Sequence, residues 1–105
     1  MRSLNLRKLE ELAAEGSLGA LNNVGYCFLN GIGCKRNQSK GLFHLMQALE
    51  RGCRYSAYYL ADAYMNQFND YKKALVYFRL FISFPISEYH NVETAIKEIK
   101  KILKQ

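Results

Sequence analysis

The sequence has few residues of the kinds that break helices, span membranes or form disulfide frameworks. It contains one proline, Pro85, and its most apolar run, residues 74–86, is interrupted by an arginine. No window reaches the ~18 uninterrupted apolar residues of a membrane span. The three cysteines, Cys27, Cys34 and Cys53, are odd in number and form no C-x-x-C pair. A zinc site and a disulfide framework therefore both fit poorly, and we expect reduced cysteines in a cytoplasmic protein.

The composition is that of a folded chain with an excess of positive charge. Half of the 105 residues are hydrophobic, and the formal net charge is +6. The hydrophobic content argues against disorder, and the length is that of one domain. The charge suits a nucleic-acid or acidic protein partner, but it equally suits a protein that charge keeps monodisperse. Acidic residues closely follow the first basic ones with no apolar stretch between them, so no signal peptide is expected.

Apolar residues recur at helical spacing, and no stretch alternates with a period of two. Caps and breakers divide the chain into six expected helices, at about residues 4–15, 18–30, 38–51, 54–66, 70–83 and 87–105. Asn37 or Ser39 is expected to cap the third helix, Asn69 the fifth, and Ser87 to open the sixth after Pro85. The sequence thus predicts an all-α array of antiparallel helices joined by tight turns.

Part of the chain repeats itself. Gly16 and Gly52 lie 36 positions apart. The same shift places Ala20, Val24, Gly25 and Phe28 on Ser56, Leu60, Ala61 and Tyr64. Small residues thus fall on small ones and apolar residues on apolar ones. A self-match at this period is typical of helical repeat proteins, in which each unit buries its apolar face against the next.

Residues 17–52 carry a longer pattern of spaced positions. These are Ala20, Val24, Gly25, Phe28, Gly31, Gly33, Asn37, Lys40, Gly41, Ala48 and Gly52. The pattern resembles the Sel-one-like repeat, a relative of the tetratricopeptide repeat with a longer loop inside each helix pair. Residues 53–84 are similar, since they keep Leu60-Ala61-x-x-Tyr64 and Asp70-x-x-Lys73-Ala74. This second unit is three residues shorter and lacks the Gly-x-Gly loop.

The resemblance implies a short right-handed α-solenoid of antiparallel helix pairs, with about six helices in a single domain, 1–105. Residues 1–16 would form an end helix similar to half a repeat, and 17–52 a full repeat. Residues 53–84 would form a shortened repeat, and 87–105 a capping helix.

The resemblance also implies a binding face, because the first helix of each pair lines the concave face in that family. Carried over residue by residue, this gives a partner-binding set of Asn22, Asn23, Tyr26, Asn30, Tyr55, Tyr58, Tyr59, Asp62 and Asn66. Tyrosine and asparagine offer rigid contact area and amide hydrogen bonds, which suit a peptide or protein surface. The alternative is that some of the tyrosines pack between helices.

Basic residues gather at the loop end of each unit. They are Lys35, Arg36, Lys40, Lys72 and Lys73. Stacked units would align them along one edge, which could attract an acidic partner and speed association. The alternative is a solvated edge with no role.

Catalytic chemistry has little support in the sequence. His44 and His90 lack a partner at metal-ligand spacing, and the segment 31–35 lacks the G-K-[ST] ending of a phosphate loop and follows a helix. We expect no enzyme activity, no cofactor and no metal.

The expected function is therefore a non-catalytic protein–protein interaction module with no membrane partner. One form of it is an inhibitor or immunity protein that covers the active site of a toxin, which the small size and the lack of a further domain suggest. The alternative is a nucleic-acid-binding protein that uses the basic edge.

Overall fold

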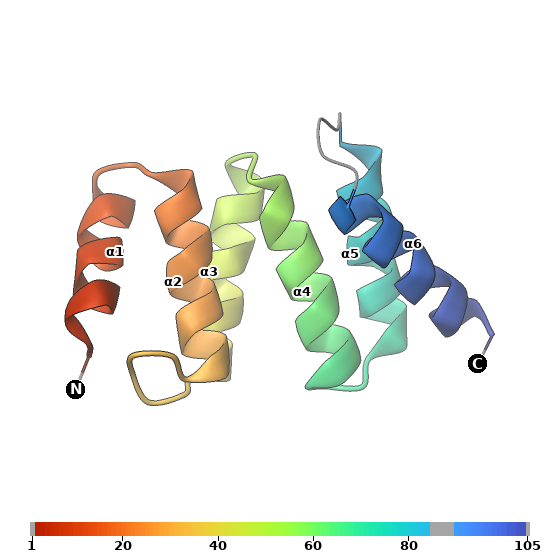
Figure 1. Cartoon of the computed structure of the whole chain (residues 1–105), viewed down its shortest axis with the longest axis horizontal. Coiled ribbons are helices and arrows are strands. Elements are labelled where there is room, and N and C mark those ends of the chain that lie inside the picture. The colour runs from red at the N-terminus through yellow and green to blue at the C-terminus, as the bar shows by residue number, and fades with distance from the viewer. Residues whose placement is uncertain (1, 85–89, 105) are drawn as a thin grey trace. The chain divides into compact units, whose positions relative to one another are not determined.

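A computed structural model describes residues 2–84 and 90–104, and these residues form six helices and no strand (Figure 1). The helices are α1 (Leu4–Ala14), α2 (Leu18–Asn30), α3 (Gln38–Glu50), α4 (Arg54–Asn66), α5 (Tyr71–Ser83) and α6 (His90–Leu103). The all-α class is confirmed, and five of the helices end close to the boundaries that the sequence predicts. The expected start of the last helix at Ser87 lies outside the described residues.

Side-chain caps fix the start of the first three helices. The hydroxyl oxygens of Ser3 and Ser17 and the amide oxygen of Asn37 each accept a hydrogen bond from a backbone N–H three residues later, all at 3.1 Å. Each bond satisfies one of the N–H groups that a helix start leaves without an intrahelical acceptor. Asn37, and not Ser39, is therefore the cap of α3.

The expected cap of α5 was wrong by one residue. Asp70 is the N-cap, because its carboxylate accepts a hydrogen bond from the backbone N–H of Lys73 at 3.2 Å. Asn69 instead has a φ of 52°, in the left-handed region. Asparagine tolerates that conformation better than most residues do, so Asn69 turns the chain and its neighbour caps the helix.

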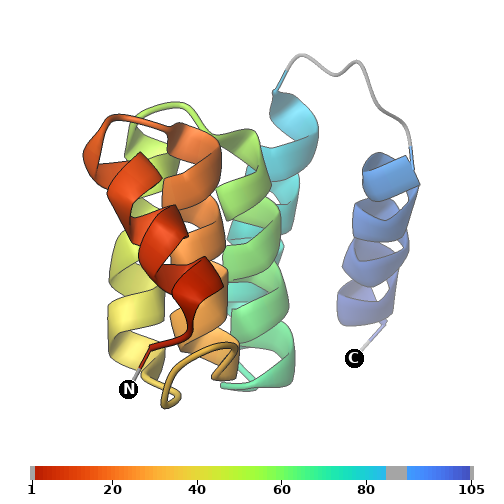
Figure 2. The ribbon, with the colours of Figure 1, turned by 60° about the vertical axis from the view of Figure 1, so that its left-hand side comes forward.

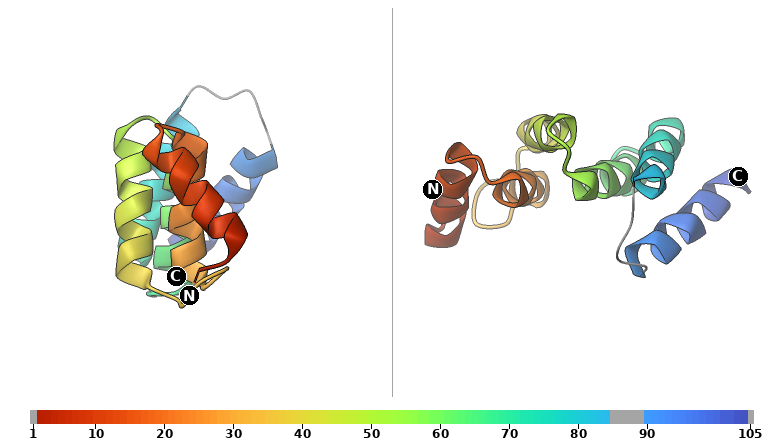
Figure 3. Two further views of the ribbon diagram at one scale, coloured as in Figure 1. Left: turned by 90° about the vertical axis from the view of Figure 1, so that its left-hand side faces the viewer. Right: turned by 90° about the horizontal axis from the view of Figure 1, so that it is seen from above.

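The chain divides into two compact units, Met1–Ser56 and Ala57–Gln105. The first holds α1, α2, α3 and the first turn of α4, and the second holds the remainder of α4 with α5 and α6. Whether the two form the single domain expected from the sequence stays a prediction. In the first unit, α1 packs against α2 (Figure 2), and α2 lies side by side with α3 (Figure 3).

Two glycines allow α2 and α3 to approach closely. A Cβ atom added to Gly25 would lie 2.8 Å from Cγ of Leu45, and one added to Gly41 would lie 2.7 Å from the backbone nitrogen of Leu29. Both distances are shorter than real Cβ contacts. The hydrophobic core beside this contact is formed by side chains that are nearly or fully buried, among them Leu6, Val24, Phe28, Leu29 and Leu45.

Aromatic rings pack between α4 and α5 in the second unit. Tyr58 on α4 packs edge to face against Phe78 and Phe81 on α5, with ring centroids 5.9 Å and 5.4 Å apart. Nearer the other end of α4, Tyr64 stacks on Tyr77 at 5.7 Å. Such pairs add to the free energy gained from burial alone. The last helix, α6, packs against α5 within this unit.

We expect Gly41→Ala and Gly25→Leu each to lower the free energy of unfolding by about 1–3 kcal/mol, through overpacking of the α2–α3 contact. Thermal and urea melts measure this change. Gly19→Ala is the matched control, because nothing lies within 4 Å of a Cβ at that helical position. The control should be as stable as the parent or slightly more stable. Equal stability of all four proteins would contradict the close contact.

Candidate functional site

The last turn of α2 is closed by the loop that follows it. Gly31 ends the helix with a φ of 69°, and its N–H donates to the carbonyl of Cys27. The N–H of Ile32 donates to the same carbonyl at 2.9 Å, and the thiol of Cys34 donates to it at 3.7 Å. Glycine is suited to this left-handed position because it has no Cβ.

The next two carbonyl groups of α2 are also satisfied by the loop. Phe28 accepts a hydrogen bond from the N–H of Asn37 at 2.8 Å, and Leu29 accepts one from Nε of Arg36 at 3.1 Å. Because helix ends leave such carbonyls without intrahelical donors, these bonds stabilise the loop in one conformation. The loop therefore holds its basic side chains in defined places.

The segment before α1 is tied to the same loop by a backbone hydrogen bond. The N–H of Ser3 donates to the carbonyl of Gly33 at 2.6 Å. Gly33 has a φ of 75°, and a Cβ at this position would lie 3.2 Å from Cβ of Ser3. Any other residue would be strained and would push the N-terminal segment away. Gly33 thus allows residues at the start of the chain to lie beside the α2–α3 loop.

An open cleft lies in the first unit, where the end of α2, the α2–α3 loop and the segment before α1 meet. Its volume is about 890 Å³. It is lined by Arg2, Arg7, Phe28, Cys34, Lys35, Arg36, Asn37 and Lys40. Five of these eight residues carry a positive charge, and none carries a negative charge. Clustered charges of one sign in a concave site raise the local concentration of counter-ions.

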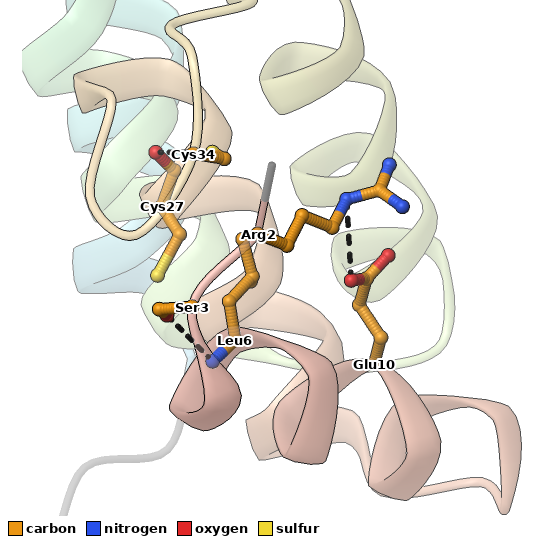
Figure 4. Close-up of polar contacts among 6 residues, drawn as sticks. All are labelled: Arg2, Ser3, Leu6, Glu10, Cys27 and Cys34. Carbon is orange, nitrogen blue, oxygen red and sulfur yellow. Dashed lines mark hydrogen bonds and ion pairs between the residues drawn. The ribbon is translucent and has the colours of Figure 1, made fainter.

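Cation–π contacts hold two of these charges over the same ring. The guanidinium carbon of Arg2 lies 5.2 Å from the ring centroid of Phe28, and Nζ of Lys40 lies 4.6 Å from it. Both distances are within the range of a favourable cation–π interaction. Nε of Arg2 also pairs with a carboxylate oxygen of Glu10 at 3.3 Å (Figure 4). The site therefore already contains one arginine–carboxylate pair.

The structure brings together part of the basic set that the sequence predicts. Lys35, Arg36 and Lys40 line the cleft, whereas Lys72 and Lys73 belong to the second unit. The sequence reading missed Arg2 and Arg7. Their charge is plain in the sequence, but their place beside the loop depends on the contact between Ser3 and Gly33, which local patterns do not reveal.

The second unit repeats part of this arrangement without the cleft loop. The N–H of Asp70 donates to the carbonyl of Tyr64 at 2.8 Å, as Asn37 does to Phe28 in the first unit. Nζ of Lys73 lies 5.3 Å from the ring centroid of Tyr64, as Lys40 lies over Phe28. The lysine–aromatic pair is therefore a feature of both repeats, and the additional cations are a feature of the first.

On α2, three of the predicted partner-binding residues are exposed and one is buried. Asn23, Tyr26 and Asn30 are exposed and follow each other at helical spacing on one face. Asn22 is 5% exposed, and its amide oxygen accepts a hydrogen bond from the hydroxyl of Ser56 at 2.8 Å. Its side chain contributes to packing inside the unit. The amide of Asn30 donates to the backbone carbonyl of Tyr26 at 3.0 Å.

The predicted residues on α4 are half-buried, apart from Asn66, which is exposed. Tyr55 is half-buried beneath the guanidinium of Arg54, 4.8 Å from its ring centroid. Tyr58 packs on the phenylalanines of α5, and burial raises the pKa of its phenol, with a further contribution from the carboxylate of Asp62. Tyr58 therefore fills space between helices, which is the alternative left open by the sequence.

The other predicted positions on α4 contact neighbours on the same helix. Tyr59 is half-buried and in ring contact with Tyr58 at 6.1 Å. Asn66 is exposed, and its amide donates to the carboxylate of Asp62 at 2.8 Å.

Across residues 2–84 and 90–104, histidine, cysteine, aspartate and glutamate side chains nowhere gather in groups of three that could hold a metal ion. None of the helices in these ranges combines the length and apolar character needed to cross a bilayer.

The inward position of Asn22 can be tested by its effect on stability. We expect Asn22→Ala to lower the free energy of unfolding by about 1–3 kcal/mol, because the buried hydroxyl of Ser56 loses its acceptor. Asn23→Ala changes the adjacent, exposed position and should alter stability by less than ~0.5 kcal/mol. Urea denaturation of both variants checks this. Similar losses of unfolding free energy in the two variants would contradict the assignment of Asn22 to the interior and Asn23 to the surface.

The three thiols should differ in reactivity. Burial raises the pKa of the Cys27 thiol above its usual range, and the charge of the neighbouring Cys34 raises it further (Figure 4). A raised pKa leaves less thiolate near pH 8, so iodoacetamide should modify Cys27 more slowly than Cys34 and Cys53, which are half-buried. Mass spectrometry of timed reactions measures the order. Unfolding in urea should remove the difference, and preferential labelling of folded Cys27 would refute it.

Comparison with known proteins places the chain in a family. The family model for the Sel1 repeat matches residues 19–53 and 54–83, close to the two units expected from the sequence. Searches of curated proteins and of solved structures gave no match. Sel1 repeats generally mediate protein–protein interaction. Because the two matched segments cover more than half of its residues, the chain belongs to the Sel1 repeat family.

Proposed function

We propose that this chain is a non-catalytic protein-binding module whose first repeat contacts a partner through the exposed face of α2. The observation that carries the proposal is the row formed by Asn23, Tyr26 and Asn30, which is exposed while the adjacent Asn22 is turned into the unit. The general role of Sel1 repeats supports it.

The chemistry of this row suits a protein surface. Tyr26 is 37% exposed, and a tyrosine supplies a large contact area with few rotatable bonds. The two asparagines beside it can donate and accept hydrogen bonds. All three lie on a helix fixed by the close contact with α3, so binding would require little ordering of the surface.

A finer form of this proposal is an inhibitor or immunity protein that covers the active site of a toxin. A rigid helical surface could occlude a catalytic cleft without chemistry of its own. We place this activity in the cytoplasm, because all three cysteines are free. Expressing the toxin with and without this protein, and measuring the toxin's activity, tests the finer form separately from binding itself.

The face of α2 can be tested with a partner purified from the native host. Isothermal titration calorimetry should show that Tyr26→Ala raises the Kd roughly 10- to 30-fold, as expected for a central tyrosine. Phe43→Ala is the matched control, since it removes another exposed aromatic ring from the same unit and should change the Kd by less than ~2-fold.

Two results would refute the proposal. One is the absence of any protein partner under native conditions. The other is a Kd that rises for Phe43→Ala and stays unchanged for Tyr26→Ala. Melting curves of both variants confirm that the comparison is made between folded proteins.

A further inference from the structure

The basic cleft of the first unit contains more positive charge than its surroundings balance. Arg2, Arg7, Lys35, Arg36 and Lys40 line it. Among residues 2–84 and 90–104, the ion pairs are Arg2 with Glu10, which borders the cleft, and Lys101 with Glu98 on α6. Arg7, Lys35 and Lys40 therefore have no carboxylate partner within ion-pair distance among these described residues. Like charges gathered in this way repel one another, so an anionic ligand would be bound favourably.

Several of these charges are fixed in place before any ligand arrives. Nε of Arg36 is held by the carbonyl of Leu29, and Arg2 and Lys40 both lie over the ring of Phe28. The pairing of Arg2 with Glu10 shows that a carboxylate fits against one of them. Cations that are already positioned lose less side-chain entropy when they bind an anion.

We propose that this cleft binds an acidic peptide segment of a partner protein, with carboxylates of the segment paired to Lys35 and Lys40. The proposal rests on the protein-binding function proposed above, and it adds the chemistry of the partner and a second contact surface. Lysine and arginine both pair with carboxylates, and arginine does so with two parallel hydrogen bonds. The volume of about 890 Å³ is in the range of sites that bind drug-sized ligands, which is enough room for part of a peptide segment.

Two features favour a peptide over a nucleic acid. Binding to a single strand uses exposed aromatic rings on which bases stack, but Phe28, the aromatic residue lining the cleft, is only 3% exposed. Binding to a duplex uses an extended basic surface that follows the phosphates. Along α1 the positive charge of Arg7 and Lys8 gives way to Glu10, Glu11 and Glu15, so on that side the basic region is short.

The test uses the intact protein and a short fluorescein-labelled peptide of alternating glutamate and serine. Fluorescence anisotropy at ~0.15 M salt, where long-range attraction is screened, measures the Kd. The double variant Lys35→Gln/Lys40→Gln removes two cleft cations and should raise the Kd at least ~10-fold, because both are close charge partners of the bound carboxylates.

The second unit supplies a matched control. Lys72→Gln/Lys73→Gln removes the same charge, and Lys73 lies over Tyr64 as Lys40 lies over Phe28. This variant should change the Kd by less than ~2-fold, because both lysines are exposed and neither lines the cleft. Circular dichroism melts of all three proteins establish that each is folded.

A Kd for the peptide that rises in Lys35→Gln/Lys40→Gln and not in Lys72→Gln/Lys73→Gln supports the proposal. Three results overturn it. One is that the parent protein does not bind the peptide, and another is that both double variants raise the Kd for the peptide equally. The third is that a single-stranded oligonucleotide of the same charge binds more tightly than the peptide and that only Lys35→Gln/Lys40→Gln loses this binding. Equal losses would indicate a general electrostatic effect, and the last result would indicate a nucleic-acid site.

The outcome can be separated from that of the proposed function. If the parent protein does not bind the peptide but Tyr26→Ala still raises the Kd for the native partner, only the proposal for the cleft is refuted. If the protein binds the peptide but Tyr26→Ala leaves the Kd for the native partner unchanged, only the proposal for the α2 face is refuted.

Discussion

The structure of the first unit depends on how the end of α2 is closed. The carbonyls of Cys27, Phe28 and Leu29 cannot find donors inside the helix and must find them beyond it. The loop supplies those donors from its backbone, a thiol and a guanidinium. This requirement determines the course of the loop and the point at which α3 begins. It also places the loop's basic side chains beside the segment that precedes α1.

The sequence revealed this unit well where the signals are local. Glycines at positions with positive φ, serine and asparagine caps, and helical spacing of apolar residues are each read within a few neighbouring residues. The cap of α5 shows the limit of such reading. Asn69 and Asp70 are both good caps, and only the backbone conformation decides between them.

The candidate surfaces were less accessible to sequence reading because they depend on contacts between distant residues. Asn22 and Asn23 are the same amino acid on the same helix. Only Asn22 is buried, where it accepts a hydrogen bond from the hydroxyl of Ser56, 34 residues away. Likewise, Arg2 joins the cleft through a backbone bond between Ser3 and Gly33. Family patterns describe which positions of a repeat face outward on average, and such individual contacts change that assignment residue by residue.

The two repeats show where a unit of this family can change without loss of its packing. Nine positions separate Phe28 from Asn37, whereas six separate Tyr64 from Asp70. Both pairs nevertheless form the same backbone hydrogen bond, at 2.8 Å in each unit. The longer connection therefore leaves the aromatic residue, its lysine and the helix cap in place, and adds the residues that carry the extra charge. Because the helices tolerate this change, differences in binding between such repeats are expected first in this loop.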